Sequence, residues 1–391
     1  MKSKKDYLMN KDFQILHGDA LTVLRGMESE SVQCAITSPP YYGLRSYKTV
    51  PQIWGNHNGC DHAFGETMRN PKADPRSAEL KRSQGANIGG TITYNADTAN
   101  GTSGNFCLSC NSWRGELGLE PTFDGPNGYI AHLIEIFAEV KRVLKKDGIC
   151  VVNLGDSYAG DSPVRSKTSE VFSKSWDANQ TASRGGPRRS AKFNVVRPKS
   201  LMNIPHRFAI AMTDELQFVQ RNECIWYKRA CMPSSATDRF TVNFEPIFMF
   251  AKNGKYKFNQ QLEDFADERM GNPSGGVRKY GGEDRNDVGR ELAWNENGEI
   301  KGRNKRTVMD VPFEPSSDPH YASYPTKLIE PFILAGTDEG DTVLDIFNGT
   351  ATTGVTAIRH HRKYIGIELN QEYIEISKRR LREVQPVLLG L

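Results

Sequence analysis

The sequence predicts an α/β fold, a doubly wound and mostly parallel sheet with loop-rich insertions. Near both ends of the chain, short apolar runs of strand length alternate with amphipathic helical segments, a pattern typical of parallel sheets. A buried strand at 342–347 leads into a glycine-containing turn, a helix and a second strand, the order of a nucleotide-binding unit. Only about forty residues follow that turn, too few for the remaining strands. Those strands must come from the N-terminal half, so the strand order is permuted.

Composition sets the broad class. The chain has 391 residues, 25% of them charged, and can bury the core of one large domain with insertions or of two to three domains. We expect no membrane span and no secretory signal, because no apolar run approaches ~20 residues and none follows the N-terminal lysines. Seven cysteines are few and odd in number, which favours a reducing cytosol. A net charge of +4 does not by itself indicate nucleic acid.

The first predicted unit is a strand at 13–16, a helix between 20 and 27, and a strand at 32–36. Parallel strands present ligands at their carboxyl ends, and this brings Asp19 and Ser38 to one edge of the sheet. A carboxylate at the position of Asp19 could cap the helix or bind a ligand, and the sequence leaves both open.

The second strand runs into the hexapeptide Thr-Ser-Pro-Pro-Tyr-Tyr at 37–42. Proline cannot donate to a ladder and holds the preceding residue extended. Ser38 and Pro39 therefore turn their carbonyl groups outward beside the ring of Tyr41. Such a turn is either a rigid strand end or a clamp for a planar polar group.

Between 48 and 128 the periodicity fails, and we expect an insertion of long loops. It carries a Cys-x-His pair and a Cys-x-x-Cys pair, soft ligands suited to a tetrahedral zinc ion that would order a loop with little core. The alternative is four ordinary reduced side chains. The candidate ligands are Cys60, His62, Cys107 and Cys110, with His57 as a spare.

The middle of the chain restores order. We expect a helix at 129–144 that ends at a glycine cap, Gly148, followed by a strand at 149–154 buried on both faces. The stretch 159–200 has no periodicity and is predicted to be a mobile basic loop. It is either a solvated loop or an arm that grips phosphates. Its candidate DNA-binding residues are Arg184, Arg188, Arg189 and Lys192.

The remaining segments extend the sheet. They are a helix at 206–212, strands at 218–219, 223–227 and 244–251, a short helix at 331–334, a strand at 342–347, helices at 355–360 and 373–384, and a strand at 364–368. The region 262–318 loses pattern and is expected to be a basic module of loops and short elements.

The C-terminal unit has the parts that bind a nucleotide. Gly349 lets the backbone approach a ligand, Gly354 lets the helix pack closely, and Glu368 can hold ribose hydroxyls. These features alone permit a nicotinamide dehydrogenase or an adenosyl-cofactor enzyme. The position of the turn disfavours the dehydrogenase, which would also leave the Ser-Pro-Pro-Tyr strand end unexplained.

Three motifs together resemble a known family. Residues 37–41 resemble the (D/N/S)-P-P-(Y/F) motif of amino-group DNA methyltransferases, and 345–354 resembles their S-adenosylmethionine loop, D-x-F-x-G-S-G-T-T. Residues 324–328 look like the motif upstream of that loop. The catalytic motif comes first and the cofactor motif last, as in the β class with its Rossmann-like sheet. Two departures, Thr350 and Ala351, replace a common serine and glycine, and Ala351 should crowd the cofactor slightly.

The resemblance implies roles for individual residues. Ser38, Pro39, Pro40 and Tyr41 would hold a base flipped out of double-stranded DNA. The residues implied in S-adenosylmethionine binding are Asp19, Thr326, Lys327, Asp345, Phe347, Gly349, Thr350, Thr352 and Glu368. No metal is needed for the chemistry, so any zinc would be structural.

Serine at the first motif position resembles the cytosine-N4 enzymes, and we favour cytosine over the alternative, adenine-N6. An RNA methyltransferase and a non-catalytic zinc-bearing DNA-binding protein are the other readings. A homodimer, a partner restriction endonuclease and a cytoplasmic site in a bacterial or phage-infected cell are further expectations. The predicted organisation is a catalytic-motif segment at 10–47, the insertion at 48–128, core at 129–258, target recognition at 259–318 and cofactor binding at 319–391.

Overall fold

The computed structural model describes residues 12–44, 46–55, 59–64, 105–159, 196–231, 233–263, 303–314 and 324–384. Statements about the structure concern these residues. The spare ligand His57 and the four predicted DNA-binding residues of the 159–200 stretch (Arg184, Arg188, Arg189 and Lys192) lie outside them. No helix in the described ranges combines the length and the apolar character that spanning a membrane requires.

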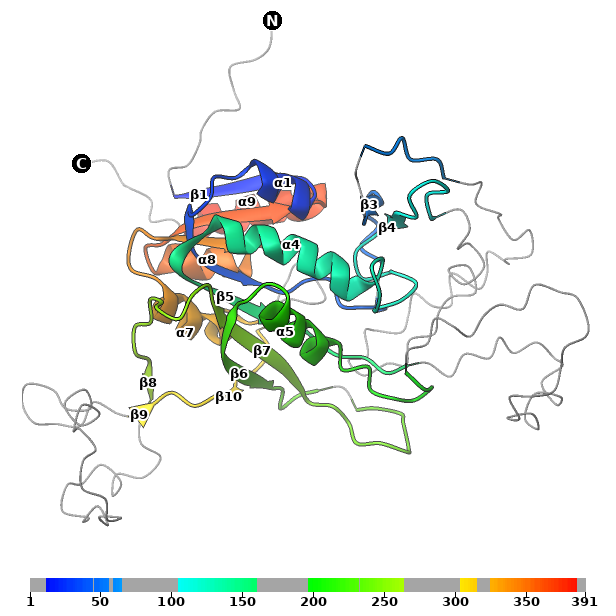
Figure 1. Cartoon of the computed structure of the whole chain (residues 1–391). Helices are drawn as coiled ribbons and strands as arrows, with labels where there is room; N and C mark the ends of the chain where they lie inside the picture. The colour runs from blue at the N-terminus through cyan, green and yellow to red at the C-terminus, as the bar shows by residue number, and fades with distance from the viewer. Residues whose placement is uncertain are drawn as a thin grey trace, which may run out of the picture.

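The core is one eight-stranded sheet with helices on both faces (Figure 1). β7 is antiparallel to both of its neighbours, and every other pairing in the sheet is parallel. The strand order is β1 (Phe13–His17), β12 (Lys363–Glu368), β11 (Thr342–Asp345), β2 (Val32–Thr37), β5 (Leu144–Asn153), β7 (Phe244–Ala251), β6 (Val219–Tyr227) and β10 (Val308–Asp310).

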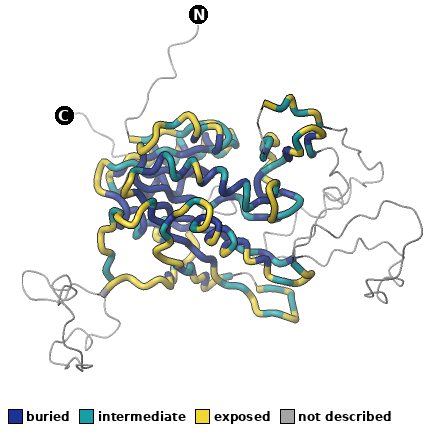
Figure 2. The backbone as a smooth tube through the Cα atoms, viewed as in Figure 1, coloured by how far each residue is buried: buried dark blue, intermediate teal, exposed yellow. Residues whose placement is uncertain are grey.

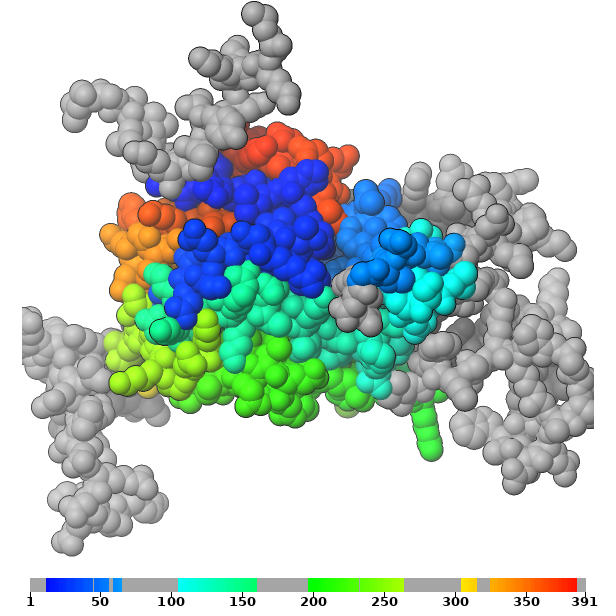
Figure 3. Space-filling model, turned by 45° about the horizontal axis from the view of Figure 1, so that its top comes forward, coloured from blue at the N-terminus to red at the C-terminus, as the bar shows by residue number. Residues whose placement is uncertain are grey.

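The predicted permutation is confirmed by the pairing of the two chain ends. β12 pairs with β1, with Tyr364 opposite Phe13, and β11 pairs with β2, with Val343 opposite Cys34. In the space-filling view the N-terminal segment lies against the C-terminal elements (Figure 3). The nucleotide-binding unit therefore borrows its neighbouring strands from the start of the chain.

Each face of the sheet has its own apolar cluster. The first cluster packs α1 (Ala20–Gly26), α4 (Tyr129–Val143) and α5 (Ile204–Asp214) on one face. The second packs α7 (Thr326–Gly336), α8 (Thr352–Arg359) and α9 (Gln371–Val384) on the other.

The central strands explain why their sequences are apolar throughout. Ala35 of β2 and Cys150 of β5 face the first cluster, whereas Ile36 and Ile149 face the second. Alternate side chains of a strand point to opposite faces, so a strand covered on both sides needs apolar residues at every position. Figure 2 shows these strands as the buried centre of the molecule.

Several boundary predictions are wrong. Gly148 does not cap α4, because the chain passes at Leu144 directly into β5, with φ −65° and ψ 138°. Gly148 instead lies inside β5, where an added Cβ would come within 2.9 Å of the Gln33 carbonyl oxygen. Two predicted strands at 218–219 and 223–227 form the single strand β6, with a register shift between Gln220 and Asn222.

Two other segments hold more structure than periodicity indicated. α7 begins at Thr326 and continues through Pro331, so the predicted helix at 331–334 was too short. Within 262–318, β8 (Leu262–Glu263) pairs with β9 (Arg303–Asn304), and β10 extends the core sheet beyond β6. Strands of two or three residues are too short to produce a periodic pattern. The insertion contributes the hairpin β3 (Gln52–Trp54) and β4 (Trp113–Gly115).

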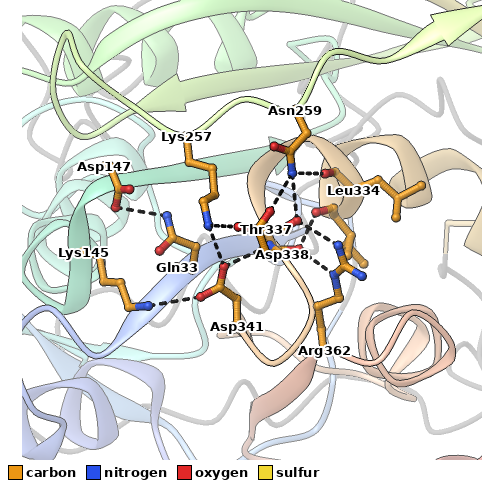
Figure 4. Close-up of polar contacts among 11 residues, drawn as sticks. Gln33, Lys145, Asp147, Lys257, Asn259, Leu334, Thr337, Asp338, Asp341 and Arg362 are labelled. Carbon is orange, nitrogen blue, oxygen red and sulfur yellow. Dashed lines mark hydrogen bonds and ion pairs between the residues drawn. The ribbon is translucent and has the colours of Figure 1, made fainter. Parts of the chain in front are cut away.

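A network of ion pairs and hydrogen bonds lies on the side of the sheet where β11 begins (Figure 4). We call this side the closed edge. The Lys257 ammonium lies 2.6 Å from Asp338 and 3.1 Å from Asp341, and Lys145 of β5 lies 3.2 Å from the other oxygen of Asp341. Burial acts to raise the pKa of Asp341, but hydrogen bonds from the Asp338 amide and both lysines outweigh it and lower the pKa. This edge is therefore held together by charge.

Candidate active site

A cavity of about 460 Å³ lies at the opposite edge, where the parallel strands end. It is within the size range of small-molecule and cofactor sites. Most of the predicted site residues line it, including the whole catalytic tetrapeptide. They are Asp19, Ser38, Pro39, Pro40, Tyr41, Asp345, Phe347, Gly349, Thr350, Thr352 and Glu368.

The upstream motif contributes a different residue from the two predicted. Thr326 and Lys327 are not part of the cavity lining, and both the amide and the hydroxyl of Thr326 donate to the Glu314 carboxylate, at 3.0 and 2.7 Å. Tyr324 lines the cavity instead, and its hydroxyl donates to Asp345 at 3.3 Å. The motif reaches the cavity through its first residue.

Asp345, at the end of β11, organises the cofactor turn. One carboxylate oxygen accepts from the Thr37 hydroxyl at 2.7 Å and the Phe347 amide at 3.1 Å. The other accepts from the Thr353 hydroxyl at 2.6 Å and from Tyr324. Burial raises the pKa of Asp345, while these donors lower it. Hydroxyl groups thus satisfy this carboxylate without a cation.

Glu368 ends the neighbouring strand β12 and faces the same turn. Its carboxylate accepts backbone amides from Gly349 at 2.8 Å, Leu369 at 3.0 Å and Asn370 at 2.8 Å. Burial nevertheless raises the pKa of Glu368 to about 7. Gly349 has φ +53°, a left-handed conformation that glycine adopts without strain, and this brings its amide to the carboxylate. The carboxylate is therefore fixed where ribose hydroxyls could donate to it.

Two further expectations concern Asp19 and Ala351. Asp19 caps α1, accepting from the Thr22 amide at 2.9 Å, and it also lines the cavity, so its ligand role stays a prediction. Ala351 is fully buried in the second apolar cluster and is absent from the cavity lining. The expected crowding of the cofactor by Ala351 is therefore wrong.

The catalytic turn is held by contacts on three sides. The Tyr129 hydroxyl of α4 donates to the Pro40 carbonyl at 2.6 Å. The ring of Tyr41 packs on Gly155, where a Cβ would lie only 2.4 Å from a ring carbon, so a larger residue there would displace the ring. The Gly43 amide donates to the Gly118 carbonyl at 2.6 Å, which ties the turn to the insertion.

The phenol of Tyr41 meets a buried charged pair. Its hydroxyl lies 2.8 Å from one carboxylate oxygen of Glu245 and 3.0 Å from the Asn153 side-chain oxygen. The other Glu245 oxygen is ion-paired with Lys228, and both side chains are buried. The Ser38 hydroxyl donates toward Tyr41 at 3.4 Å. Burial and the Glu245 charge raise the pKa of Tyr41 well above its usual value, so it stays a neutral phenol.

Sequence reasoning missed Glu245, Lys228 and Asn153 as site residues. A signal existed, because Glu245 interrupts the otherwise apolar run at 244–251. A charge inside a buried strand requires a partner. That partner, Lys228, directly follows β6, but only the antiparallel pairing of β6 with β7 brings the two together.

The four predicted metal ligands converge in the insertion. Their ligand atoms all lie within 4.8 Å of one another, with the Cys60 and Cys107 sulfurs 3.8 Å apart and the Cys110 sulfur 3.3 Å from His62 Nδ1. A tetrahedral zinc ion with bonds of about 2.3 Å would hold its sulfur ligands about 3.8 Å apart. The Cys110 backbone amide lowers the pKa of Cys107 to about 5, which favours a thiolate there, whereas a hydrogen bond with Cys110 raises the pKa of Cys60 to about 12. The donor set therefore fits zinc.

A permuted, doubly wound sheet with an adenosyl-type cavity and a Ser-Pro-Pro-Tyr turn at its edge defines an S-adenosylmethionine-dependent amino-methyltransferase. Comparison with known families agrees. Residues 32–379 match the model of the DNA methylase family whose members act on N6 or N4 amino groups, and the chain belongs to that family.

Individual relatives cover nearly the whole chain. It is 30% identical over 369 residues to the type II methyltransferase M.Cfr9I of Citrobacter freundii, covering 94% of this chain and 87% of that one. M.XycI of Xanthomonas campestris pv. cyanopsidis gives the same identity and coverage. The structure of the PvuII DNA methyltransferase (cytosine-N4-specific) matches with a TM-score of 0.50 and 16% identity, covering 97% of this chain and 89% of that one. This structural likeness shows the fold alone.

Cofactor affinity should depend on the ionisation of Glu368. We expect S-adenosylmethionine to bind about tenfold more tightly at pH 8 than at pH 6, because only the carboxylate can accept two ribose hydroxyls and its pKa is about 7. Isothermal titration at both pH values checks this. Glu368→Gln should bind weakly with a flat pH profile, whereas equal wild-type affinity at the two pH values contradicts the assignment.

The same shift affects stability with a defined sign. A carboxyl group whose pKa rises from 4.5 to about 7 on folding stabilises the fold fully below pH 4.5, and this contribution is lost as pH rises through 7. The loss amounts to about 3 kcal/mol. Without cofactor, Glu368→Gln should therefore gain stability over wild type at pH 8 in urea unfolding, and no gain would argue against a raised pKa.

A third prediction concerns the buried ion pair between Lys228 and Glu245, next to the Tyr41 hydroxyl. Glu245→Gln leaves the Lys228 ammonium buried without its counter-charge, and removal of one partner of such a pair costs about 3–5 kcal/mol. Urea unfolding measures the loss. The double variant Lys228→Met/Glu245→Gln should recover most of it, since no unpaired charge remains. An additive double variant would mean that the two groups do not interact.

Proposed function

We propose that this methyltransferase transfers the methyl group of S-adenosylmethionine to the N4 amino group of cytosine in duplex DNA, after the base has turned out of the helix. The observation that carries the proposal is the placement of Ser38. Its hydroxyl lies at the edge of the cavity that also contains the residues of the cofactor turn, next to the fixed phenol of Tyr41.

The proposed chemistry depends on positioning. An exocyclic amine is a poor nucleophile, because its lone pair is delocalised into the ring. Hydrogen bonds from its two protons to the Ser38 hydroxyl and the Pro39 carbonyl draw the nitrogen toward tetrahedral geometry and free the lone pair. When bound, S-adenosylmethionine would supply an electrophilic methyl group on its sulfonium. The new N–C bond would form as the S–C bond breaks to leave a thioether, and the methylated nitrogen would release one of its two protons to water. Correct orientation of two reactants can itself contribute several kcal/mol, about 7–11 in favourable cases.

Tyr41 contributes a flat, uncharged surface for the base. Glu245 and Asn153 hold its hydroxyl, and Gly155 leaves room for the ring. A ring fixed in this way can stack on a flipped base without losing side-chain freedom on binding. The neutral phenol adds no negative charge that would compete for the sulfonium.

The preference for cytosine rests on the serine. The PvuII enzyme, which shares the fold at 16% identity, is cytosine-N4-specific. Adenine-N6 methylation is the alternative, because the family includes both activities. Methyl transfer to RNA is a second alternative.

The relatives also suggest a biological role. Several are type II methyltransferases of bacteria, so we infer that the protein modifies a specific DNA sequence within a restriction–modification system, in the cytoplasm of a bacterial or phage-infected cell. A cognate endonuclease and a homodimer are part of this proposal. Recognition through 259–318, and phosphate contacts through Arg184, Arg188, Arg189 and Lys192, stay predictions.

The base is identified by product analysis. Purified protein, tritiated S-adenosylmethionine and DNA from a methylation-free host are incubated, and the nucleosides are separated after digestion. We expect N4-methylcytosine. Ser38→Ala should reduce transfer at least about 100-fold with unchanged cofactor affinity, since it removes one of the two acceptors that orient the amine.

Ser29→Ala, an exposed serine near the closed edge of the sheet, serves as the matched control and should keep full activity. N6-methyladenine as the only product would replace the proposal by its adenine alternative. Label in RNA but not in duplex DNA would overturn both.

We also propose one structural zinc ion per chain, bound by Cys60, His62, Cys107 and Cys110. Metal analysis of freshly purified protein should give about one equivalent, and Cys110→Ser should give less than half. Cys231→Ser is the control, because this free cysteine lies outside the cluster and should leave the zinc content unchanged. Less than half an equivalent in the wild type would exclude the site.

A further inference from the structure

The insertion does more than carry a metal cluster, because part of it forms a wall of the catalytic cavity. Gln52 and Trp54 of β3, and Glu116 and Leu117 after β4, line the cavity together with the catalytic turn. Glu116 also accepts from the Ser46 hydroxyl at 2.8 Å. The hairpin is therefore continuous with the site.

We infer that His132 and Glu120 are positioning residues that hold the catalytic turn against this insertion, so that the zinc-bearing hairpin sets the geometry of the base clamp. The inference rests on the proposed role of Ser38 and Tyr41 in binding the flipped base.

His132 is the centre of the link. This residue of α4 is only 1% exposed, and its ring stacks on two indoles of the insertion. Its ring is 5.3 Å from that of Trp54 at an interplanar angle of 24°, and 5.8 Å from that of Trp113 at 13°. These two ring contacts pack both β3 and β4 against the helix.

Glu120 connects this stack to the catalytic turn. Its carboxylate accepts from His132 Nδ1 at 3.0 Å and from the Gly118 amide at 2.8 Å. Gly118 has φ +91°, and its Cα region packs against the turn, where a Cβ would lie 3.2 Å from the carbonyl oxygens of both Pro40 and Tyr41. A shift of Glu120 would therefore move Gly118, and with it the Pro40 and Tyr41 carbonyl groups of the catalytic turn.

The same helix holds the turn at a second point. Tyr129, one turn before His132, donates to the Pro40 carbonyl. The turn is thus gripped from α4 by Tyr129 and from the insertion by Gly118, and the His132–Glu120 pair joins the two supports.

The chemistry of the His132–Glu120 pair suggests that it positions the catalytic turn and does not primarily stabilise the fold. Both side chains are almost fully buried, and burial raises the pKa of Glu120. Within the described part of the chain, His132 Nε2 is buried without a hydrogen-bond partner. Burying an unsatisfied polar atom and a carboxylate is unfavourable, and an apolar pair would pack at less cost. Their presence is explained if the directed hydrogen bonds matter.

The far side of the stack reaches the metal cluster. Trp113 follows Ser112, whose hydroxyl lies 3.0 Å from the Cys110 sulfur and whose carbonyl accepts from the Cys107 amide at 2.8 Å. Phe106 also bridges to Trp113 in the antiparallel sense. An ordered Cys/His cluster therefore also holds Trp113, the indole that stacks on His132, in place.

The test separates clamp geometry from folding. His132→Phe keeps a flat ring between the indoles and removes the donor to Glu120, Glu120→Gln removes the charge at constant volume, and His132→Asn restores a donor near the Nδ1 position. His360→Asn is the matched control, since His360 pairs with Glu330 on the opposite face. Each variant is assayed for single-turnover methyl transfer, S-adenosylmethionine affinity, zinc content and melting temperature.

We expect His132→Phe and Glu120→Gln to lose at least about tenfold in the single-turnover rate, because small displacements of reacting groups are costly. Cofactor affinity should stay within about twofold and zinc content should be unchanged. His132→Asn should recover the rate to within about threefold of wild type, and His360→Asn should match wild type.

The inference is overturned if both variants transfer at the wild-type rate, if the rate falls only in proportion to cofactor affinity, or if both unfold at the assay temperature. The count of transferred methyl groups does not depend on which base receives them. A wild-type enzyme that methylates adenine would therefore overturn the cytosine proposal and leave this comparison intact.

Discussion

A buried hydrogen bond, from the Thr37 hydroxyl to the Asp345 carboxylate at 2.7 Å, links the carboxyl ends of the paired strands β2 and β11. Thr37 ends the strand that leads into the proposed base-binding turn, and Asp345 ends the strand that leads into the proposed cofactor turn. They are separated by 308 positions along the chain and meet because β11 inserts between β12 and β2. The donor of the methyl group and its acceptor can only face each other if this pairing is kept.

The two edges of the sheet are built on different principles. At the closed edge, Lys145 and Lys257 pair with Asp338 and Asp341, and these partly exposed groups act as a network, each pair contributing little alone. At the open edge, Asp345 and Glu368 have no cation among their described partners and are satisfied by hydroxyls and backbone amides. Ion pairs thus stabilise the closed edge. At the open edge the carboxylates are satisfied by neutral donors, and the cavity stays free for ligands.

Local sequence predicted the parts whose signal lies within one element. The apolar run of β11, the glycine turn after it and the prolines that end β2 each have a physical cause inside about ten residues. The Cys and His residues that converge in the insertion were also identified from their spacing. What could not be read was pairing at a distance. Lys228 meets Glu245 only through the register of β6 on β7, and Trp54 meets His132 only through the packing of the insertion. β10 is too short to show a period.

The balance of charge inside the cavity affects the relative affinities for the methyl donor and for its demethylated product. Its lining contains several carboxylates and one lysine, Lys228, which is already paired with Glu245. Low-dielectric walls with an excess of acidic groups favour a cationic ligand. S-adenosylmethionine carries a positive sulfonium, and transfer of the methyl group converts it to a neutral thioether. The same carboxylates are therefore expected to bind the methyl donor more tightly than the spent cofactor, so the electrostatics that favour substrate binding would also assist release of the product.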